Sequence, residues 1–531
     1  MDRRRFLKTS VATSAGLMAA SPSQAHARPK PVQTIEPQNP NGRLMLRPDE
    51  SRHVLIVGGG LAGLSAALEL CDRGYTVTVK EAAPFLGGKL GTRTETNAEG
   101  TFNVEHGLHM WFHNYHNFKD IRRRLGIDDD FVPYNEIHFI FRDYEPEVLK
   151  SEPPIYPLNL IQLLRRSPNL SLFSAFRQLG MLQDVVGYNH DTVYDRLDNI
   201  TFAEWAKSRV SKTFYNLIME PAASVTLNDV DIVSAAEMVQ FMHLYFMSDP
   251  RAMNREVTTK DHATAVIDPW VKYLRERGAT IMTDTPVKGL VFEDSCPVKE
   301  VDDDVRYDWV ILATSIPGTQ SILNNSVAAD EISQEVVAGL QDKVNELEVA
   351  LPYRVARFWL DRQPTEEVPD IIETPQHKPI NLAVQFHLLE EESAEWAART
   401  GGSVLELHLY ANPEIVALDE SQLWSRVSSV VDEILPGLGG ARVLAQSVGT
   451  FEDFTSFGVG QGQTRPRSSF IFQVGGDRLS LAGDWLKTNY PSALMEKAVS
   501  TGREAANLCL FYDDVREATL TVTNSRGPGI L

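Results

Sequence analysis

The feature that most constrains this chain is a glycine-rich stretch near its N-terminal end. The sequence His53-Val-Leu-Ile-Val-Gly-Gly-Gly-Leu-Ala-Gly63 predicts a buried strand that runs into a tight loop and then a helix. Its glycines stand at Gly58, Gly60 and Gly63, in the spacing G-x-G-x-x-G. The first permits the turn, the second lets the backbone approach a pyrophosphate, and the third lets helix and strand pack closely. The predicted helix, Leu61 to Arg73, would point its amide end at that phosphate.

The residues after this helix strengthen the prediction. A second strand, Tyr75 to Val79, ends just before Glu81, whose carboxylate accepts hydrogen bonds from a ribose diol in proteins of this type. The glycine spacing by itself also occurs in tight turns of ordinary α/β domains. Here strand, loop, helix, strand and acidic residue follow in the order of a dinucleotide-binding unit, so we expect the chain to bind an adenine dinucleotide.

Composition narrows the class of protein. The chain has 531 residues, of which 43% are hydrophobic and 23% charged, as in soluble globular proteins. Its length fits several domains or one discontinuous two-domain enzyme. A net charge of −20 argues against nucleic acid as a partner, because the phosphate backbone would be repelled. The three cysteines, Cys71, Cys296 and Cys509, are widely spaced and show no metal-ligand pattern.

The N-terminus predicts an export signal. The charged segment Arg3-Arg-Arg-Phe-Leu-Lys8 is followed by a short apolar run, Val11 to Ala20, and by an A-x-A cleavage site at Ala25-His-Ala27. The paired arginines resemble a twin-arginine signal, and the apolar run is too short to span a bilayer. We therefore expect residues 1–27 to be a signal peptide and the mature protein to work in a periplasm or lumen; the alternative is a disordered basic tail.

Short strands and helical stretches alternate along the rest of the chain. Residues 28–50, rich in proline and polar side chains, predict an extended linker, and residues 511–531 a tail that is loosely ordered after Asp513. We expect a dinucleotide-binding domain from residues 51–120, 265–330 and 451–510, and an inserted α+β substrate domain from residues 121–264 and 331–450. Strands are expected at Thr280–Met282, Val287–Phe292, Trp309–Thr314, Arg354–Leu360, Leu382–Leu388, Val404–Tyr410 and Leu479–Ala482, and helices at Ile267–Arg277, Ser421–Leu435 and about Ser492–Leu510.

Two helix starts in the middle of the chain resemble capping boxes. These are Thr201-x-x-Glu204 and Ser234-x-x-Glu237, where each side chain would satisfy an exposed helix amide. After the second, Met238, Phe241, Met242, Tyr245 and Phe246 recur on one helix face. A core stripe is the preferred interpretation, and the wall of an apolar substrate tunnel is the alternative.

Four further motifs carry chemistry. Gly87-Gly-Lys89 offers backbone amides at Gly88 and a cation to a phosphate. Glu105-x-Gly-Leu-His109, followed by Phe112, Tyr115 and Asn117, closely resembles the pattern of phytoene and zeta-carotene desaturases. Leu481-Ala-Gly-Asp484 and Ser492-x-x-Met-Glu496 resemble their C-terminal signature. The chain thus resembles the carotenoid desaturase branch of the flavin-containing amine oxidase superfamily, while Val404–Ala411 and Pro491–Ala498 also resemble flavoproteins that aromatise carotenoid rings.

This resemblance implies a Rossmann-like FAD-binding domain, discontinuous in sequence, with an inserted α+β substrate domain. It implies FAD as cofactor and assigns residues to it. The implied contacts are Glu81 with the adenosine ribose, Gly88 and Lys89 with the pyrophosphate, Val287 with the adenine, Gly107 and His109 beside the flavin, Gly483 and Asp484 with the ribityl or phosphate region, and the amide of Met495 with the flavin pyrimidine edge. A helix start at Met495 would stabilise negative charge on reduced flavin.

The sequence departs from the family pattern at two places and offers one competing interpretation. Lys497 stands where the desaturases usually have glycine, and Ser315 ends a motif that usually ends in glycine. Four histidines, His106, His109, His113 and His116, lie at helix-like spacings that suggest a metal site. Interleaved aromatic residues and the lack of a carboxylate or cysteine at ligand spacing argue for no metal.

We expect an FAD-dependent enzyme that removes hydride equivalents from, or isomerises, a long apolar polyene or isoprenoid. Hydride transfer to flavin N5 needs few protein acids, so no catalytic residue is assigned; His109 is the side chain expected nearest the flavin. A quinone or oxygen would reoxidise the flavin, with peripheral membrane contact. Three rivals stay open: an amine oxidase with Trp485 and Tyr490 in an aromatic cage, a redox-neutral isomerase or dehydroxylase, and a non-catalytic flavin- or carotenoid-binding protein.

Overall fold

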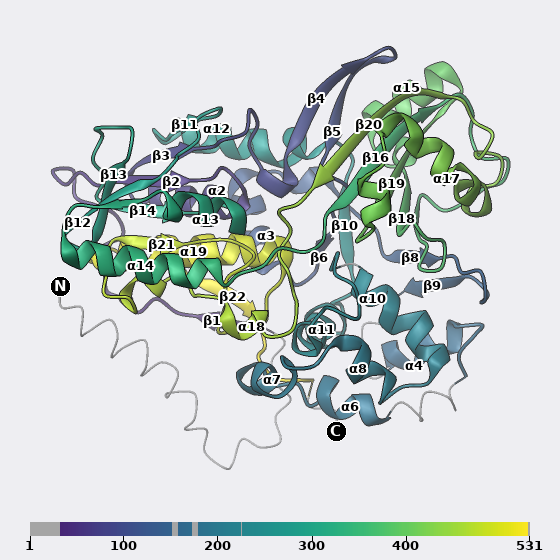
Figure 1. Cartoon of the computed structure of the whole chain (residues 1–531), viewed down its shortest axis with the longest axis horizontal. Coiled ribbons are helices and arrows are strands. Elements are labelled where there is room, and N and C mark those ends of the chain that lie inside the picture. The colour runs from purple at the N-terminus through teal and green to yellow at the C-terminus, as the bar shows by residue number, and fades with distance from the viewer. Residues whose placement is uncertain (1–31, 151–157, 172–178, 225, 529–531) are drawn as a thin grey trace.

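A computed structural model of the protein describes residues 32–150, 158–171, 179–224 and 226–528. The predicted signal peptide, residues 1–27, lies outside these residues. Figure 1 shows a parallel sheet with its helices on the left, a second sheet at the upper right, and a group of helices at the lower right. Within the described part of the chain, no helix is both long and apolar enough to cross a membrane.

The first sheet has five strands in the order β11-β3-β2-β14-β21, and every neighbouring pair is parallel. Its strands come from segments far apart in the chain: β2 (His53–Val57), β3 (Thr76–Lys80), β11 (Thr280–Met282), β14 (Trp309–Leu312) and β21 (Leu479–Leu481). Helices or strands cover both faces, which explains why these strands are continuous apolar runs. The predicted Rossmann-like α/β fold is confirmed.

Two helices pack closely beside this sheet. Helix α2 (Leu61–Cys71) follows β2 directly, and α19 (Leu494–Tyr512) lies against α2. A side chain at Gly502 of α19 would collide with the carbonyl oxygen of Ala62, so the two backbones touch. The predicted helix from Leu61 to Arg73 is two residues too long, because Gly74 (φ +82°) turns the chain into β3.

The second sheet has seven strands in the order β20-β16-β19-β18-β17-β8-β9. They are β8 (Glu136–Phe139), β9 (Glu147–Lys150), β16 (Tyr353–Leu360), β17 (Ile371–Glu373), β18 (Leu382–Gln385), β19 (Ser403–Leu409) and β20 (Val443–Phe451). One face packs on α17 (Glu420–Ile434) through a cluster that includes Phe358, Leu407 and Val427. Because side chains alternate along a strand, the other face carries different residues, and it faces the parallel sheet.

The remaining elements link and cover the two sheets. The helices are α3 (His116–Leu125), α4 (Leu158–Arg166), α6 (Leu179–Val185), α7 (His190–Leu197), α8 (Phe202–Lys207), α9 (Lys212–Phe214), α10 (Glu220–Ser224), α11 (Ala235–Met242), α12 (Asp268–Glu276), α13 (Ile316–Asn324), α14 (Glu331–Asn345), α15 (Glu391–Thr400), α16 (Pro413–Val416) and α18 (Gln461–Thr464). The short strands are β4 (Thr92–Asn97), β5 (Gly100–Glu105), β6 (Trp111–Phe112), β7 (Phe131–Pro133), β10 (Arg255–Thr258), β12 (Leu290–Glu293), β13 (Cys296–Glu300) and β15 (Val327–Ala328).

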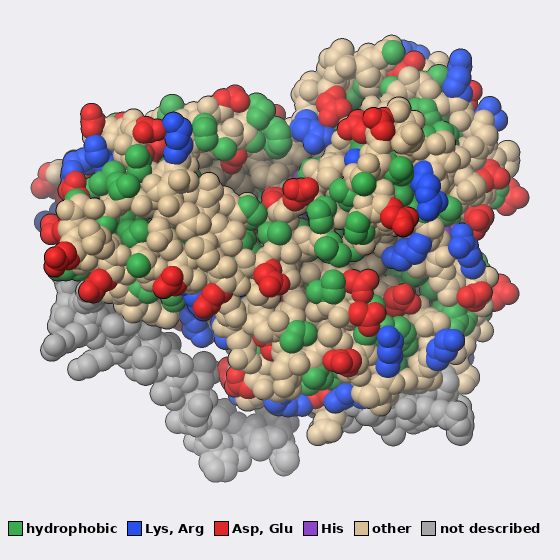
Figure 2. Space-filling view, in the orientation of Figure 1, with side chains coloured by type: hydrophobic (Ala, Val, Ile, Leu, Met, Phe, Trp, Pro, Cys, Tyr) green, Lys and Arg blue, Asp and Glu red, His purple; other side chains and the backbone are tan. Residues whose placement is uncertain are grey.

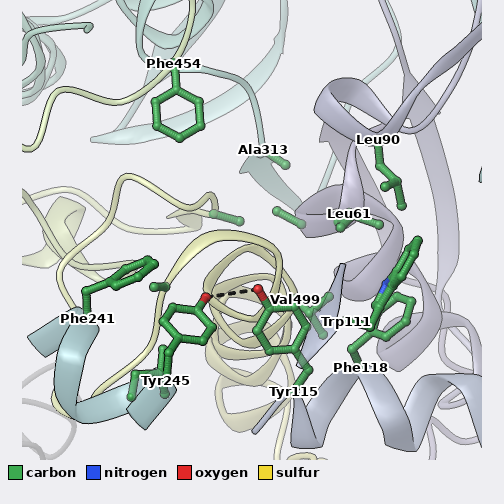
Figure 3. Close-up of a cluster of buried hydrophobic side chains, with 14 of the residues drawn as sticks. Leu61, Leu90, Trp111, Tyr115, Phe118, Phe241, Tyr245, Ala313, Phe454 and Val499 are labelled. Atoms are coloured by element: carbon green, nitrogen blue, oxygen red, sulfur yellow. Dashed lines mark hydrogen bonds between the residues drawn. The ribbon is translucent and has the colours of Figure 1, made fainter. Parts of the chain in front are cut away.

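The apolar stripe after Ser234 belongs to the core, as preferred from the sequence. Phe241 and Tyr245 join the largest buried cluster, which links α2, α3, α11 and α19. Figure 3 shows Tyr245 beside Tyr115, with a hydrogen bond of 3.0 Å between their hydroxyl groups. The stripe therefore packs against the core segment that carries Tyr115.

Only one of the two predicted capping boxes forms. Thr201 and Glu204 exchange both expected hydrogen bonds at the start of α8. At the start of α11, Ser234 accepts from the amide of Ala236, but Glu237 forms a buried ion pair of 2.6 Å with Arg465. The second prediction was wrong because a distant arginine, invisible to local spacing, competes for the carboxylate.

The expectations of an extended linker and a loosely ordered tail were also wrong in part. Strand β1 (Val32–Ile35) pairs antiparallel with β22 (Leu520–Thr523), and Figure 1 shows the pair below the parallel sheet. Leu520 and Val522 are buried, and the Asn117 side chain donates a hydrogen bond of 2.9 Å to the carbonyl of Thr521. The two chain ends order each other, which no local pattern reveals.

Candidate functional site

A cavity of about 590 Å³ lies between the parallel sheet and the polar face of the seven-stranded sheet. Figure 2 shows the surface hollowed between these two parts of the molecule, with acidic side chains spread over the face rather than gathered in one patch. Eleven of the twelve residues predicted to bind the cofactor line this cavity: Gly58, Gly60, Glu81, Gly88, Lys89, Gly107, His109, Val287, Gly483, Asp484 and Met495. The twelfth, Gly63, packs behind the loop.

The three glycines of the first loop serve different purposes. Gly58 has φ +105°, and a side chain there would lie 2.5 Å from the Ala313 carbonyl oxygen. A side chain at Gly63 would collide with the Gly58 carbonyl oxygen, so helix α2 needs this glycine to pack. A methyl group added at Gly60 would meet Gly88 Cα as its nearest protein atom, 3.7 Å away. The protein therefore has room for a side chain at Gly60, and this room belongs to the cavity, where a pyrophosphate would fit.

The carboxylate of Glu81 is held at the edge of the cavity. One oxygen accepts the Gly59 amide hydrogen at 2.7 Å, and the other accepts that of Ala83 at 2.8 Å. Each carboxylate oxygen has two lone pairs, so both keep the capacity to accept a hydroxyl. This geometry fits the predicted contact with a ribose diol.

Two predicted residues form an ion pair. The ammonium group of Lys89 lies 2.9 Å from the carboxylate of Asp484 and 5.1 Å from the centre of the Phe454 ring. Lys89 follows the second glycine loop, whereas Asp484 follows β21, so the pair ties together segments almost 400 residues apart. The ion pair orients the Lys89 ammonium group along the cavity wall.

The start of helix α19 faces the cavity. Leu494, Met495 and Ala498 line it, and Leu494 adopts φ +50°, a conformation that is rare for residues other than glycine. The preceding residue, Ala493, provides no side-chain cap. The uncapped amides give this end of the helix a partial positive charge, which suits the negative edge of a reduced flavin.

His109 is a neutral, fixed side chain. Its Nδ1 lies 2.8 Å from the Gly107 carbonyl oxygen, which can only accept, so Nδ1 carries the proton. Burial, and then the neighbouring His262, lower the pKa of His109 to about 3. The imidazole is therefore uncharged at neutral pH. Among the residues that the structure describes, no group of three or more His, Cys, Asp or Glu side chains is arranged to hold a metal ion.

A buried charge cluster beside the cavity was missed by the sequence analysis. The Arg357 guanidinium lies 2.9 Å from Glu406, 3.4 Å from Glu390 and 3.5 Å from Glu105. Burial alone would raise the pKa of Glu406, but Arg357 and His408 outweigh it and hold that pKa at about 2. Burial raises the pKa of Glu105 to about 7. Burial and the neighbouring charge of Glu105 raise the pKa of Glu390. Glu406 is thus the ionised partner of Arg357.

The signal for this cluster was present in the sequence. Along Val404-Leu-Glu-Leu-His-Leu-Tyr410, polar and apolar residues alternate. This alternation puts Glu406 and His408 on one face of β19 and the leucines on the other, and Tyr410 follows directly after the strand. The sequence shows this polar face, but only the structure shows that it is buried, which is what indicates a site.

Comparison with known proteins identifies the family of this chain. Residues 61–510 match the family model described as flavin containing amine oxidoreductase. The chain belongs to this family. It is therefore an enzyme of the oxidoreductase superfamily, and its cofactor is FAD. The putative protoporphyrinogen oxidase from Exiguobacterium sp. 255-15 shares its fold, with a TM-score of 0.59, 16% identity and coverage of 87% of this chain and 99% of that one.

Relatives place the chain in the carotenoid desaturase-like branch of the superfamily. The carotenoid phi-ring synthase of Chlorobaculum tepidum is 26% identical over 90% of this chain and 91% of its own length. That of Streptomyces griseus is 28% identical over 95% of this chain and 96% of its own length. A probable zeta-carotene desaturase of Synechococcus elongatus is 29% identical over 51% of this chain and 60% of its own length.

The unequal roles of two glycines give a test of cofactor placement. In Gly60→Ala we expect FAD affinity to fall at least about tenfold, or about 1.4 kcal/mol, because the new methyl group enters the space for the pyrophosphate. The apoprotein should unfold at the wild-type temperature, since that methyl meets no protein atom closer than 3.7 Å. Flavin absorbance per protein and thermal unfolding measure the two effects.

The matched control is Gly63→Ala, which should lower the unfolding temperature even without FAD, because its methyl group collides with the Gly58 carbonyl oxygen. A Gly60→Ala protein that stays fully yellow would contradict the placement.

The raised pKa of Glu105 predicts a pH dependence of stability. The native protein keeps this proton up to a pH of about 7, whereas the unfolded chain releases it near 4.5. Between these values the native state binds more protons, so stability falls as pH rises. Glu105→Gln, which imitates the protonated side chain, should reduce this fall by on the order of 1–3 kcal/mol. Urea unfolding at pH 5 and pH 7.5 measures the fall in the free energy of unfolding. The control is Glu335→Gln at an exposed position. If Glu105→Gln shows the same fall as the wild type, the assignment is contradicted.

Proposed function

We propose that this protein is an FAD-dependent enzyme that oxidises a carotenoid-like isoprenoid at a terminal ring. The observation that carries the proposal is that one cavity is lined both by the glycine loops and by an apolar wall. That wall includes Met110, Phe112, Leu227, Val355, Leu382 and Phe454. A ring and polyene chain would bury apolar surface there and exclude water.

The relatives support the substrate class. Two of them are named carotenoid phi-ring synthases and one a probable zeta-carotene desaturase, and all three names concern carotenoids. FAD supplies a two-electron acceptor at its N5 atom, so the chain's own task is to bind the substrate, orient its ring and take up a proton. Proton uptake suits His408 and Tyr410, which reach the cavity at the end of β19.

The rival amine oxidase loses the residues first considered for it. Trp485 is fully buried and donates a hydrogen bond of 3.0 Å to the Thr314 carbonyl, and Tyr490 packs with Leu520 and Val522. Both side chains are thus part of the core and cannot form an amine-binding cage. Lys497 is also buried, and burial lowers its pKa to about 8.

An anaerobic reduction experiment tests the proposed function. The FAD-loaded protein is mixed without oxygen with a carotenoid bearing a cyclohexene end-ring, with an acyclic carotenoid, or with putrescine. We expect the ring-bearing carotenoid to bleach the flavin fastest and to lose two hydrogens per flavin reduced, as mass analysis would show. Faster bleaching by the amine would contradict the proposal. A rearranged product of unchanged mass beside oxidised flavin would show a redox-neutral enzyme instead.

We also propose that the chain is exported by the twin-arginine pathway and reoxidised by a membrane quinone or oxygen, with peripheral contact to the bilayer. The Arg3–Lys8 segment and the A-x-A site support export, and the scarcity of pyridine nucleotides outside the cytoplasm favours these acceptors.

We expect the exported protein to begin at Arg28 and expect replacement of Arg3 and Arg4 by lysine to leave precursor in the cytoplasm. N-terminal sequencing and fractionation measure this; export of the double variant at the wild-type level would contradict it.

A further inference from the structure

Glu406 and His408, on one face of β19, and Tyr410, directly after this strand, form a hydrogen-bonded chain that ends at the cavity. His408 Nε2 lies 2.8 Å from a carboxylate oxygen of Glu406, and His408 Nδ1 lies 2.7 Å from the Tyr410 hydroxyl. Glu406 is fully buried, His408 is 4% exposed, and Tyr410 and His408 both line the cavity. From this arrangement we propose that Tyr410 is the catalytic proton acceptor for the substrate, with His408 and Glu406 as its positioning relay. The proposal rests on the proposed function.

The partners of His408 determine where its proton lies. Glu406 is ionised because Arg357 and His408 outweigh the effect of burial on its pKa. A carboxylate only accepts hydrogen bonds, so His408 Nε2 carries the ring proton. Nδ1 then has a free lone pair, and the Tyr410 hydroxyl donates to it. The proton on the tyrosine oxygen is thus already directed towards a base, and a lone pair of that oxygen is left for the cavity.

The relay is fixed to the loop that borders the cofactor. The Leu108 amide donates a hydrogen bond of 3.2 Å to Glu406, and a side chain on Gly107 would lie 2.9 Å from His408 Cε1. Gly107 has φ +141°, so this backbone can approach the imidazole only as glycine. The loop therefore holds the proton acceptor at a set place relative to the residues predicted to surround the flavin.

The charges around Tyr410 disfavour a free phenolate. Glu373 faces it from β17, Tyr353 from β16 with ring centres 6.0 Å apart, and Glu406 from β19, the strand that Tyr410 follows. Burial and the Glu373 carboxyl raise the pKa of Tyr410 well above its ordinary value. Tyr410 therefore gives up its own proton to His408 only as it takes one from the substrate.

The proposed step balances as a two-electron oxidation. One ring C–H bond breaks and its electron pair leaves with the hydrogen as hydride to FAD. The adjacent C–H bond breaks towards the Tyr410 oxygen, and its electron pair forms the new C=C bond. The Tyr410 hydroxyl proton moves to His408 Nδ1, and the resulting imidazolium is stabilised by Glu406. The substrate loses one hydride and one proton; bound FAD would take up the hydride with its two electrons, and the relay holds the proton until solvent removes it.

Rapid-mixing measurements of flavin reduction test the assignment. Under saturating ring-bearing carotenoid, Tyr410→Phe should slow flavin bleaching by about 10²- to 10⁴-fold, because general-base catalysis contributes about that much. FAD content and carotenoid binding, measured by absorbance, should stay at wild-type values. His408→Gln should cost a similar factor, and the double variant should be no slower than either single one, since the residues act as a unit. The control is Tyr75→Phe, which removes a buried hydroxyl bonded to Asp513; neither residue lines the cavity.

The nitrogen-15 spectrum of the imidazole tests the positioning role of His408 directly. In protein carrying nitrogen-15 histidine and no FAD, His408 should show the Nε2-protonated tautomer, and its Nδ1 signal should shift in Tyr410→Phe.

Three outcomes would overturn the inference: bleaching of Tyr410→Phe within threefold of wild type, additive losses in the double variant, or an Nδ1-protonated His408. If no carotenoid bleaches the wild-type flavin, the proposed function fails instead; the nitrogen-15 spectrum, which needs neither FAD nor substrate, still tests the hydrogen-bond relay by itself.

Discussion

The structure depends on a very close approach of helix α2 to the segments around it. At Gly63 the helix touches the loop that precedes it, and at Gly502 the backbone of α19 touches α2. Neither place has room for a side chain, because each would collide with a carbonyl oxygen. This packing brings the start of α2 and the start of α19 to the same edge of the parallel sheet. The carboxyl ends of β2, β14 and β21 meet there, which is where ligands bind in open parallel sheets.

The two sheets contribute different surfaces to the cavity. The parallel sheet is buried on both faces, so only its edge loops reach a ligand. The seven-stranded sheet has an apolar face packed on α17 and a second buried face, on which apolar side chains such as Trp359 and Val384 lie beside the charged Arg357 and Glu406. Burying charged groups is costly unless they are paired, and the pairing of Arg357 with Glu406 offsets that cost. The result is a cavity in which an apolar wall lies beside fixed polar groups, among them Glu81, Lys89 and His408.

The sequence predictions were most accurate where local pattern and tertiary contact agree. The glycine loop, the strands of the parallel sheet and eleven cavity residues could be predicted because each depends on a short motif of known geometry. Predictions of one helix cap and one strand boundary were wrong. Glu237 left its capping box for Arg465, and Val287 lies in a loop before β12 rather than in the predicted strand. The tail after Asp513 is ordered by β1, almost 500 residues earlier in the chain.

The sequence by itself determined the dinucleotide-binding unit, because backbone conformation at spaced glycines is a local property. Its further motifs, such as Ala482-Gly-Asp484, carried the resemblance that implies the family and FAD. Only the tertiary structure decided which polar groups share the cavity. Glu105 and Arg357 lie about 250 residues apart in the chain, and their charges act on each other only because β5 and β16 place them 3.5 Å apart. Protonation depends on distance and burial, and both arise when distant segments pack.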